Sequence, residues 1–294
     1  MSRGLSRRAR SFKKEGERAF IVSRRASERL TDDLLRALLQ WQGGADVSEA
    51  DLTQALLYGT PEDVAAAIMP PDADAALRAD YEQVAATIIE IAGDAQWNEL
   101  DFEASFSLKN PYSPQWMRTY GAELVQDIGD LSRWAIREEV ARSFEQGLPP
   151  REIARTLGQW AGLRRDQARA LDAYAASLRE AGVRGDAYEA RVARQAQRLR
   201  NERGLLIART EVINAHGHGT EQSWLSARDA GYLSGEPEKT WIAAMGSERT
   251  CKICRDLDGR TAALGEPFVG AYTSVEAPTA HPQCRCAIGL DVKE

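Results

Sequence analysis

The four cysteines of this 294-residue chain all lie between residues 251 and 286, together with one of its three histidines. Cys251 and Cys254 form a C-x-x-C pair, and His281, Cys284 and Cys286 follow in the sequence HPQCRC. Zinc prefers four nitrogen or sulfur ligands in a tetrahedron, and C-x-x-C supplies two of them from one tight turn. The spacing therefore predicts a structural zinc ion (Zn2+) bound by Cys251, Cys254, His281 and Cys284, with Cys286 as the alternative ligand. Such a site would contribute folding energy to a segment that has little core of its own.

Three other states of these cysteines are compatible with the sequence. They are two disulfides, reduced thiols that only pack, and a catalytic thiol. A catalytic cysteine needs a base beside it, and no second well-placed histidine is evident near this cluster. The N-terminus is basic and lacks the apolar segment of a signal peptide. We therefore expect folding in a cytoplasm, where structural disulfides are rare.

The other two histidines, His216 and His218, stand in the sequence NAHGHG. The surrounding segment, residues 203–232, has a helical pattern despite its glycines. Side chains two residues apart on a helix point about 200° away from each other. The two imidazoles therefore cannot share a metal ion, and we predict surface or capping positions for both.

Apolar residues follow the helical period through most of the first 235 residues. Ser48 and Thr60 each stand where a helix is predicted to begin, and Pro61 suits the first helical position. After residue 235 the pattern changes, because residues 239–245 (KTWIAAM) predict a strand and Gly, Pro and Thr become frequent. We predict a mainly α fold with elongated helical N-terminal and central regions. A small α+β C-terminal domain is predicted to carry the Cys/His cluster.

Charge is distributed unevenly along the chain, although the formal net charge is only −6. Residues 1–25 contain nine Lys or Arg against two Glu, and residues 30–105 contain sixteen Asp or Glu against two Arg. A basic arm of this kind can bind nucleic acid or an acidic protein surface, or can simply be solvated. The same two alternatives apply to the row formed by Arg191, Arg194 and Arg198. The predicted division is a basic N-terminal arm (1–29), an acidic helical region (30–104), a helical core (105–235) and the small tail (236–294).

Composition excludes several classes of protein. The content of 43% hydrophobic and 28% charged residues is typical of a soluble folded chain. The longest apolar runs, such as residues 64–69, are far shorter than the ~20 residues that a membrane-spanning helix needs, so no membrane partner is expected. The sequence contains no Walker A motif, no Gly-rich phosphate loop and no paired catalytic carboxylates. We therefore predict that the chain is not an enzyme.

Several motifs resemble one known family in their order and spacing. They are EQGLPPREIARTL (145–157), ARTEVINAHGHG (208–219), DAGY (229–232), KTWIAAMGSERTCKICRDLDG (239–259), LGEPF (264–268) and HPQCRC (281–286). The chain is similar in these motifs to the phage Mu gene F-like head morphogenesis proteins, over roughly residues 105–290. The resemblance implies a minor head protein of a tailed phage, prophage or gene transfer agent.

The resemblance also implies partners and a location. The expected partners are the portal protein, other head proteins and packaged DNA. The expected location is the virion, in the head interior or at the portal vertex, after assembly in the host cytoplasm. Because an assembled particle leaves the reducing cell, a disulfide between the two cysteine segments stays open as an alternative.

Two rival functions use the same Cys/His knuckle. A metal-dependent nuclease needs an open coordination position and a general base, whereas the only late histidine here stands among the cysteines. A DNA-binding regulator needs a basic recognition element, whereas residues 239–294 are nearly neutral. Magnesium-dependent plasmid cleavage would support the first function, and sequence-specific DNA retention at moderate salt would support the second.

Overall fold

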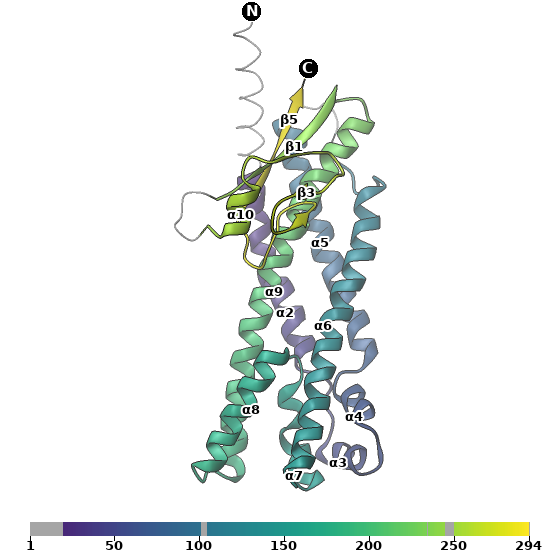
Figure 1. The fold of residues 1–294 in the computed structure, drawn as a ribbon. Helices are drawn as coiled ribbons and strands as arrows, with labels where there is room; N and C mark the ends of the chain where they lie inside the picture. Colours follow the sequence, from purple (N-terminus) through teal and green to yellow (C-terminus); the bar gives the residue numbers. More distant parts are fainter. Residues whose placement is uncertain (1–19, 101–104, 234, 245–249, 294) are drawn as a thin grey trace, which may run out of the picture. The chain divides into compact units, whose positions relative to one another are not determined.

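The computed structural model describes residues 20–100, 105–233, 235–244 and 250–293, and these residues are mainly helical, as predicted (Figure 1). Most of the predicted basic arm (1–29) lies outside the described residues. Residues 20–27 are helical and lead into a short 3-10 helix, Glu28–Leu30; a second one is Gly158–Trp160. The other helices are α2 (Thr31–Gln42), α3 (Glu49–Tyr58), α4 (Pro61–Ile68), α5 (Pro71–Glu99), α6 (Tyr112–Glu145), α7 (Pro150–Leu157), α8 (Arg165–Glu180), α9 (Gly185–Asp229) and α10 (Lys252–Leu257). Within the described ranges, none of the helices combines the length and the apolar character that a membrane crossing requires.

Side-chain caps fix the starts of the short acidic helices, as the sequence predicts. The Ser48 hydroxyl accepts a hydrogen bond from the backbone N–H of Asp51 at 3.1 Å. Thr60 and Asp63 form a reciprocal capping box, with Pro61 at the first helical position. Each cap satisfies a backbone donor that has no partner inside its helix. These local hydrogen bonds explain why α3 and α4 begin where they do.

The helix expected over residues 203–232 is part of a longer element, because α9 runs for 45 residues from Gly185 to Asp229. Its glycines serve close packing and do not form turns. A Cβ atom on Gly217 would lie 2.4 Å from the carbonyl oxygen of Pro278, and one on Gly219 would lie 2.8 Å from Cα of Ile89. Such distances leave room for hydrogen only. The glycines therefore allow two other segments of backbone to approach the helix.

Contacts divide the chain into two compact units that are interleaved in sequence. One unit consists of residues 1–33, 82–118 and 206–294, and the other consists of residues 34–81 and 119–205. The division falls within α2, α5, α6 and α9. The predicted four-part division into residues 1–29, 30–104, 105–235 and 236–294 rests on the character of the sequence and stays a prediction.

In the unit formed by residues 34–81 and 119–205, a buried arginine on α9 donates hydrogen bonds to two other segments of the chain. Arg203 on α9 is 4% exposed, and its guanidinium donates to the carbonyl of Gly162 at 2.6 Å and to the hydroxyl of Ser132 at 3.1 Å. Burial lowers the pKa of Arg203 to about 10. These two bonds satisfy the buried guanidinium, whose burial would otherwise be costly.

The same unit buries two carboxyl groups side by side. Arg142 forms ion pairs with Glu139 on α6 and with Asp172 on α8. Trp160 donates its indole N–H to Asp172 at 2.8 Å, and Ser143 donates its hydroxyl to Glu139 at 3.0 Å. Burial and the neighbouring Asp172 raise the pKa of Glu139 to about 8. One cation therefore lies beside two acids, and burial together with Asp172 favours the protonated form of Glu139.

The C-terminal residues of the other unit form two small antiparallel sheets. The first has the strand order β2-β1-β5, and the second pairs β3 with β4. The predicted strand at 239–245 is shifted in the structure: β1 begins earlier, at Glu236, and ends at Ile242, so the expected bounds are wrong. The reason is pairing, because Glu236 faces Lys293 and Ile242 faces Ala287 along the full length of β5. The strands are β1 (Glu236–Ile242), β2 (Thr261–Ala263), β3 (Phe268–Val269), β4 (Ser274–Val275) and β5 (Ala287–Lys293).

The core beneath these sheets includes residues from distant parts of the sequence. Trp224 of α9, Trp241 of β1 and Phe268 of β3 are fully buried in one cluster, and Phe20 belongs to it as well. The rings of Trp241 and Phe268 meet edge to face with centroids 5.4 Å apart. The small C-terminal region therefore shares its core with α9 and with the helix at residues 20–27, instead of forming a core alone.

Candidate metal centre

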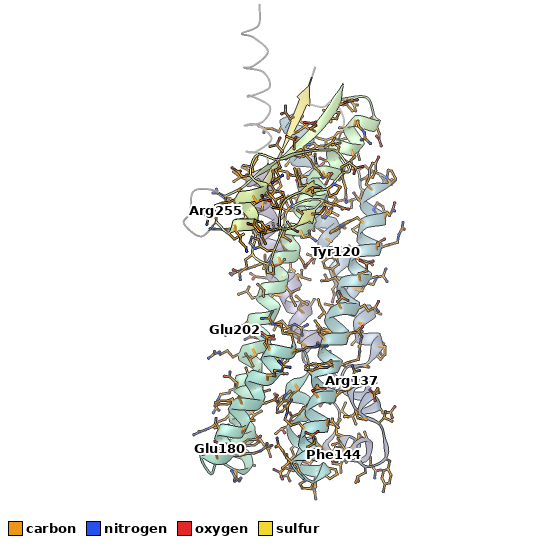
Figure 2. The ribbon with its side chains drawn as sticks, viewed as in Figure 1. Tyr120, Arg137, Phe144, Glu180, Glu202 and Arg255 are labelled. Carbon is orange, nitrogen blue, oxygen red and sulfur yellow. The ribbon has the colours of Figure 1, made fainter. Side chains whose placement is uncertain are left out.

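The C-x-x-C pair lies at the start of α10. Cys251 occupies the cap position of this helix, and its Sγ accepts a hydrogen bond from the backbone N–H of Cys254 at 3.4 Å. Arg255, which follows on the same helix (Figure 2), donates from Nε to the carbonyl oxygen of Thr250 at 2.9 Å. The helical turn and this bond hold the first cysteine segment in place. Cys251 is partly exposed, whereas Cys254 is 3% exposed.

A tight turn before β5 supplies the second group of side chains. The backbone N–H of Cys284 donates to the carbonyl of His281 at 3.1 Å. Gln283, inside this turn, has φ of 60°, and it is the single non-glycine residue with positive φ in the described ranges. The left-handed residue reverses the chain, and its N–H also approaches the hydroxyl of Thr210 at 3.3 Å. Cys284 and Cys286 are then delivered to the core as β5 begins.

All five predicted ligand residues meet in one cluster. The distances are 3.3 Å from Cys251 Sγ to His281 Nε2, 3.0 Å from Cys254 Sγ to His281 Nε2, and 3.8 Å from Cys254 Sγ to Cys284 Sγ. The ligand atoms form two groups that share Cys254. Within each group, all ligand atoms lie within 4.8 Å of one another. The two groups are Cys251, Cys254 and His281, and Cys254, Cys284 and Cys286.

The imidazole of His281 has the tautomer that suits a metal ligand. Its Nδ1 lies 2.8 Å from the carbonyl oxygen of Pro282. A carbonyl oxygen only accepts hydrogen bonds, so Nδ1 carries the proton and donates it. The Nε2 lone pair therefore faces the sulfurs of Cys251 and Cys254, which lie 3.3 Å and 3.0 Å away. A histidine held by its other nitrogen in this way is typical of metal sites.

The buried thiols do not ionise equally. A hydrogen bond from Cys286 lowers the pKa of Cys284 to about 5. Burial, together with the nearby charge of Cys284, raises the pKa of Cys254 to about 12, and the pKa of Cys286 is raised chiefly by its hydrogen bond to Cys284. Cys284 is therefore the thiolate of this trio, and a bound cation would be needed to hold further thiolates beside it.

The expected surface or capping positions of His216 and His218 are not found. His216 is fully buried: its Nε2 lies 2.7 Å from the Ser23 hydroxyl, and Phe20 meets its ring edge to face at 4.5 Å. His218 stacks on Trp116 with ring centroids 4.6 Å apart. The prediction was wrong because this stretch of α9 is covered by segments from both ends of the chain. Neither histidine belongs to the metal-capable groups found among the described residues.

A buried ion pair between β1 and α9 was not predicted from the sequence. Lys239 of β1 is fully buried, and its Nζ lies 2.5 Å from Oε1 of Glu221 on α9. Lys239 also donates to the carbonyl of Glu276 at 2.6 Å, and Glu221 accepts from the N–H of Gly265 at 2.9 Å. Burial lowers the pKa of Lys239 and raises that of Glu221. The signal in the sequence was a lysine beside the apolar residues of KTWIAAM.

Residues 171–289 match the family of Phage Mu protein F like proteins. The resemblance inferred from the motifs is therefore confirmed over these residues, which contain α9 and the whole Cys/His cluster. The match supports the role in head morphogenesis and the place in the virion that the resemblance implies. No curated protein and no solved structure matches the chain.

Proposed function

We propose that this chain is a minor head protein that associates with the portal during assembly of a tailed phage, prophage or gene transfer agent. The observation that carries the proposal is the family match over residues 171–289, which contain the Cys/His cluster and most of the buried core beneath the two sheets. A role in assembly requires no substrate turnover. The partners in this proposal are the portal protein and other head proteins.

Co-expression tests this association directly. A tagged chain is produced together with the portal protein and the other head proteins of the same genome. Retention of the chain on portal rings or procapsids, after washing at moderate salt, is the expected result. Failure to co-purify with either would contradict the proposal, and magnesium-dependent cleavage of plasmid DNA by the purified chain would favour the nuclease instead.

The proposal includes contact with packaged DNA through basic residues. Arg191, Arg194 and Arg198 are exposed along one side of α9, and Arg198 pairs with Glu202 at 3.2 Å. Phosphate contacts release counterions, so this binding should weaken steeply as salt increases. Duplex DNA retention that does not change between low and moderate salt would contradict an electrostatic contact.

We further propose that one zinc ion binds to Cys251, Cys254, His281 and Cys284, with Cys286 as the alternative ligand. Two thiolates on one tetrahedral zinc lie about 3.8 Å apart, since each Zn–S bond is about 2.3 Å long. The separation of Cys254 and Cys284, 3.8 Å, equals this value, whereas a disulfide bond is only about 2.05 Å long. The Nε2 of His281, which faces Cys251 Sγ and Cys254 Sγ, supports the same assignment. The ion would fasten the start of α10 to the turn before β5.

Elemental analysis with thiol titration on the same sample tests the zinc proposal. About one zinc per chain is expected, with the remaining thiol still open to the titrant. A Cys251→Ser or Cys284→Ser variant should lose the zinc and melt at a lower temperature, with less incorporation into heads, while the helices of residues 119–205 stay folded. A sample without zinc contradicts the proposal: few free thiols would then indicate disulfides, and four free thiols would indicate neither link.

A further inference from the structure

A cleft lies between α7 and the turn that joins α8 to α9, all within the unit of residues 34–81 and 119–205. Its volume is about 470 Å³, and four arginines contribute to its lining: Arg151, Arg155, Arg179 and Arg184. Two glutamates, Glu152 and Glu189, also line it. The lining therefore carries an excess of positive charge. Glu180, labelled in Figure 2, marks the end of α8 beside this turn.

Two of these arginines already bind a carboxylate of the chain. Arg151 Nε lies 3.0 Å from Oε1 of Glu49, and Arg155 Nε lies 3.5 Å from Oε2 of the same residue. The hydrogen bond from Arg151 is the main cause that lowers the pKa of Glu49. The planar guanidinium groups thus hold both oxygens of one acid, which is the ligand chemistry that arginine favours.

The other two arginines, Arg179 and Arg184, are held by hydrogen bonds to uncharged groups. Arg184 donates from Nη1 to the carbonyls of Arg179 at 2.6 Å and Val183 at 2.8 Å, at the C-terminal end of α8. Arg179 lies over the ring of Tyr188, with its Cζ 5.1 Å from the centroid, and donates to Gln146 at 3.3 Å. In the part of the chain that the structure describes, neither guanidinium forms an ion pair with a carboxylate. Both are therefore oriented before any ligand arrives.

The apolar residues of the cleft and the acidic residues beside it also indicate which class of ligand the cleft can bind. Leu148, Val183 and Tyr188 line the same cleft as the arginines. A neighbouring hollow of about 440 Å³ is lined by three acids, Glu49, Asp186 and Glu189, and by one arginine, Arg155. Nucleic acid presents phosphates in a continuous row and offers no aliphatic side chains that could pack against Leu148 and Val183. A peptide can place carboxylates on Arg179 and Arg184 and apolar side chains against Leu148 and Val183.

We infer that this cleft binds an acidic segment of a protein partner, whose carboxylates pair with Arg179 and Arg184. Glu49 on Arg151 and Arg155 is the chain's own example of the same contact. The inference rests on the cleft and its charges, and it is independent of the Cys/His cluster and of the proposed association with the portal. It assigns a recognition role to a face that the family match does not explain.

Fluorescence anisotropy on the full-length chain tests the inference. The probe is a fluorescein-labelled peptide rich in Glu and Leu, and its control is the same peptide with Gln in place of every Glu. The acidic peptide should bind at low and moderate salt, whereas the Gln peptide should not. The Arg179→Gln/Arg184→Gln variant should bind the acidic peptide at least about tenfold more weakly, because two charge-assisted pairs are lost.

Matched variants separate the cleft from general charge. Arg169→Gln/Arg209→Gln removes the same charge from two exposed helix positions outside the cleft, and it should leave the peptide affinity unchanged. Equal losses in both variants would overturn the inference. Competition by a single-stranded oligonucleotide as effective as by the unlabelled peptide would also overturn it, in favour of nucleic acid. Arg184→Gln alone, at an exposed position, keeps the test valid if Arg179→Gln disturbs folding.

Discussion

At the scale of single residues, the structure pairs buried charged groups that lie far apart in the sequence. Glu139 and Asp172 share one cation, Arg142, and Glu139 has a pKa raised to about 8. The sequence shows acids and arginines in helical segments, but it does not show which of them face each other inside the unit. The pairing of buried charged side chains therefore depends on tertiary packing. Its contribution to stability can be measured by substituting the paired residues.

Replacing Glu139 should change how stability depends on pH. An acid whose pKa is raised on folding contributes stability below its unfolded value, near 4.5, and this contribution is lost as pH rises through about 8. We expect the wild type to lose on the order of 3 kcal/mol between acidic and alkaline pH from this group. Glu139→Gln should flatten the melting temperature against pH, and Glu138→Gln, at an exposed neighbouring position, should not. Parallel curves for all three proteins would contradict the assignment.

Breaking the buried pair between Lys239 and Glu221 should be strongly destabilising. Lys239→Met leaves the Glu221 carboxylate buried without its cation, and the expected loss of unfolding free energy is about 3–5 kcal/mol. The double variant Lys239→Met/Glu221→Gln should recover part of this loss, because no charge remains unpaired. Denaturant unfolding of the three proteins measures the difference. A double variant less stable than Lys239→Met would show that the pair does not act as described.

At the scale of elements, helix starts follow from local sequence, whereas helix lengths do not. The capping hydrogen bonds of Ser48 and Thr60 involve residues only three positions apart, so their pattern is visible in the sequence. Helix α9 runs through glycines that suggest interruption when they are read alone. Their reason lies in the backbone that packs against the helix, at Pro278 and Ile89.

An alanine at Gly217 should therefore destabilise the protein although alanine favours helix. The added Cβ would lie 2.4 Å from the carbonyl oxygen of Pro278, a backbone atom that cannot move alone. We expect a loss of about 1–3 kcal/mol in unfolding free energy. Gly158→Ala is the matched control, since nothing lies within 4 Å of the position that its methyl group would take and its φ is −58°. Equal stability of the Gly217 variant and the wild type would refute the close contact.

At the scale of the whole molecule, the ends of the chain are joined in one core. Phe20 is fully buried in the cluster that also contains Trp224, Trp241 and the buried cysteines. Arg24, one turn later, donates from Nη1 to the carbonyl of Arg285 at 2.9 Å. The sequence suggests that the C-terminal tail is too small to be stable alone. Its hydrophobic core is completed by the helix at residues 20–27, which lies more than 200 residues earlier in the chain.

Removing this contribution should weaken the C-terminal sheets. Phe20→Ala is expected to cost about 3–5 kcal/mol, through lost burial and the cavity that remains. The rate at which Cys254 and Cys284 react with a thiol reagent should rise as their cover loosens. Val22→Ala, at a side chain that is 67% exposed, should change neither property. Unchanged melting and unchanged thiol reactivity in the Phe20 variant would contradict a shared core.

The sequence by itself determined the features that depend on neighbouring residues. Helix starts, the change of character near residue 235, the set of five candidate ligands and the family resemblance all follow from short motifs and their order. Only the tertiary structure decided which distant groups meet: Phe20 and His216, Lys239 and Glu221, and Glu139 and Asp172. The physical reason is that burial and pairing energies depend on contacts across the chain, and no periodicity in a single segment encodes them.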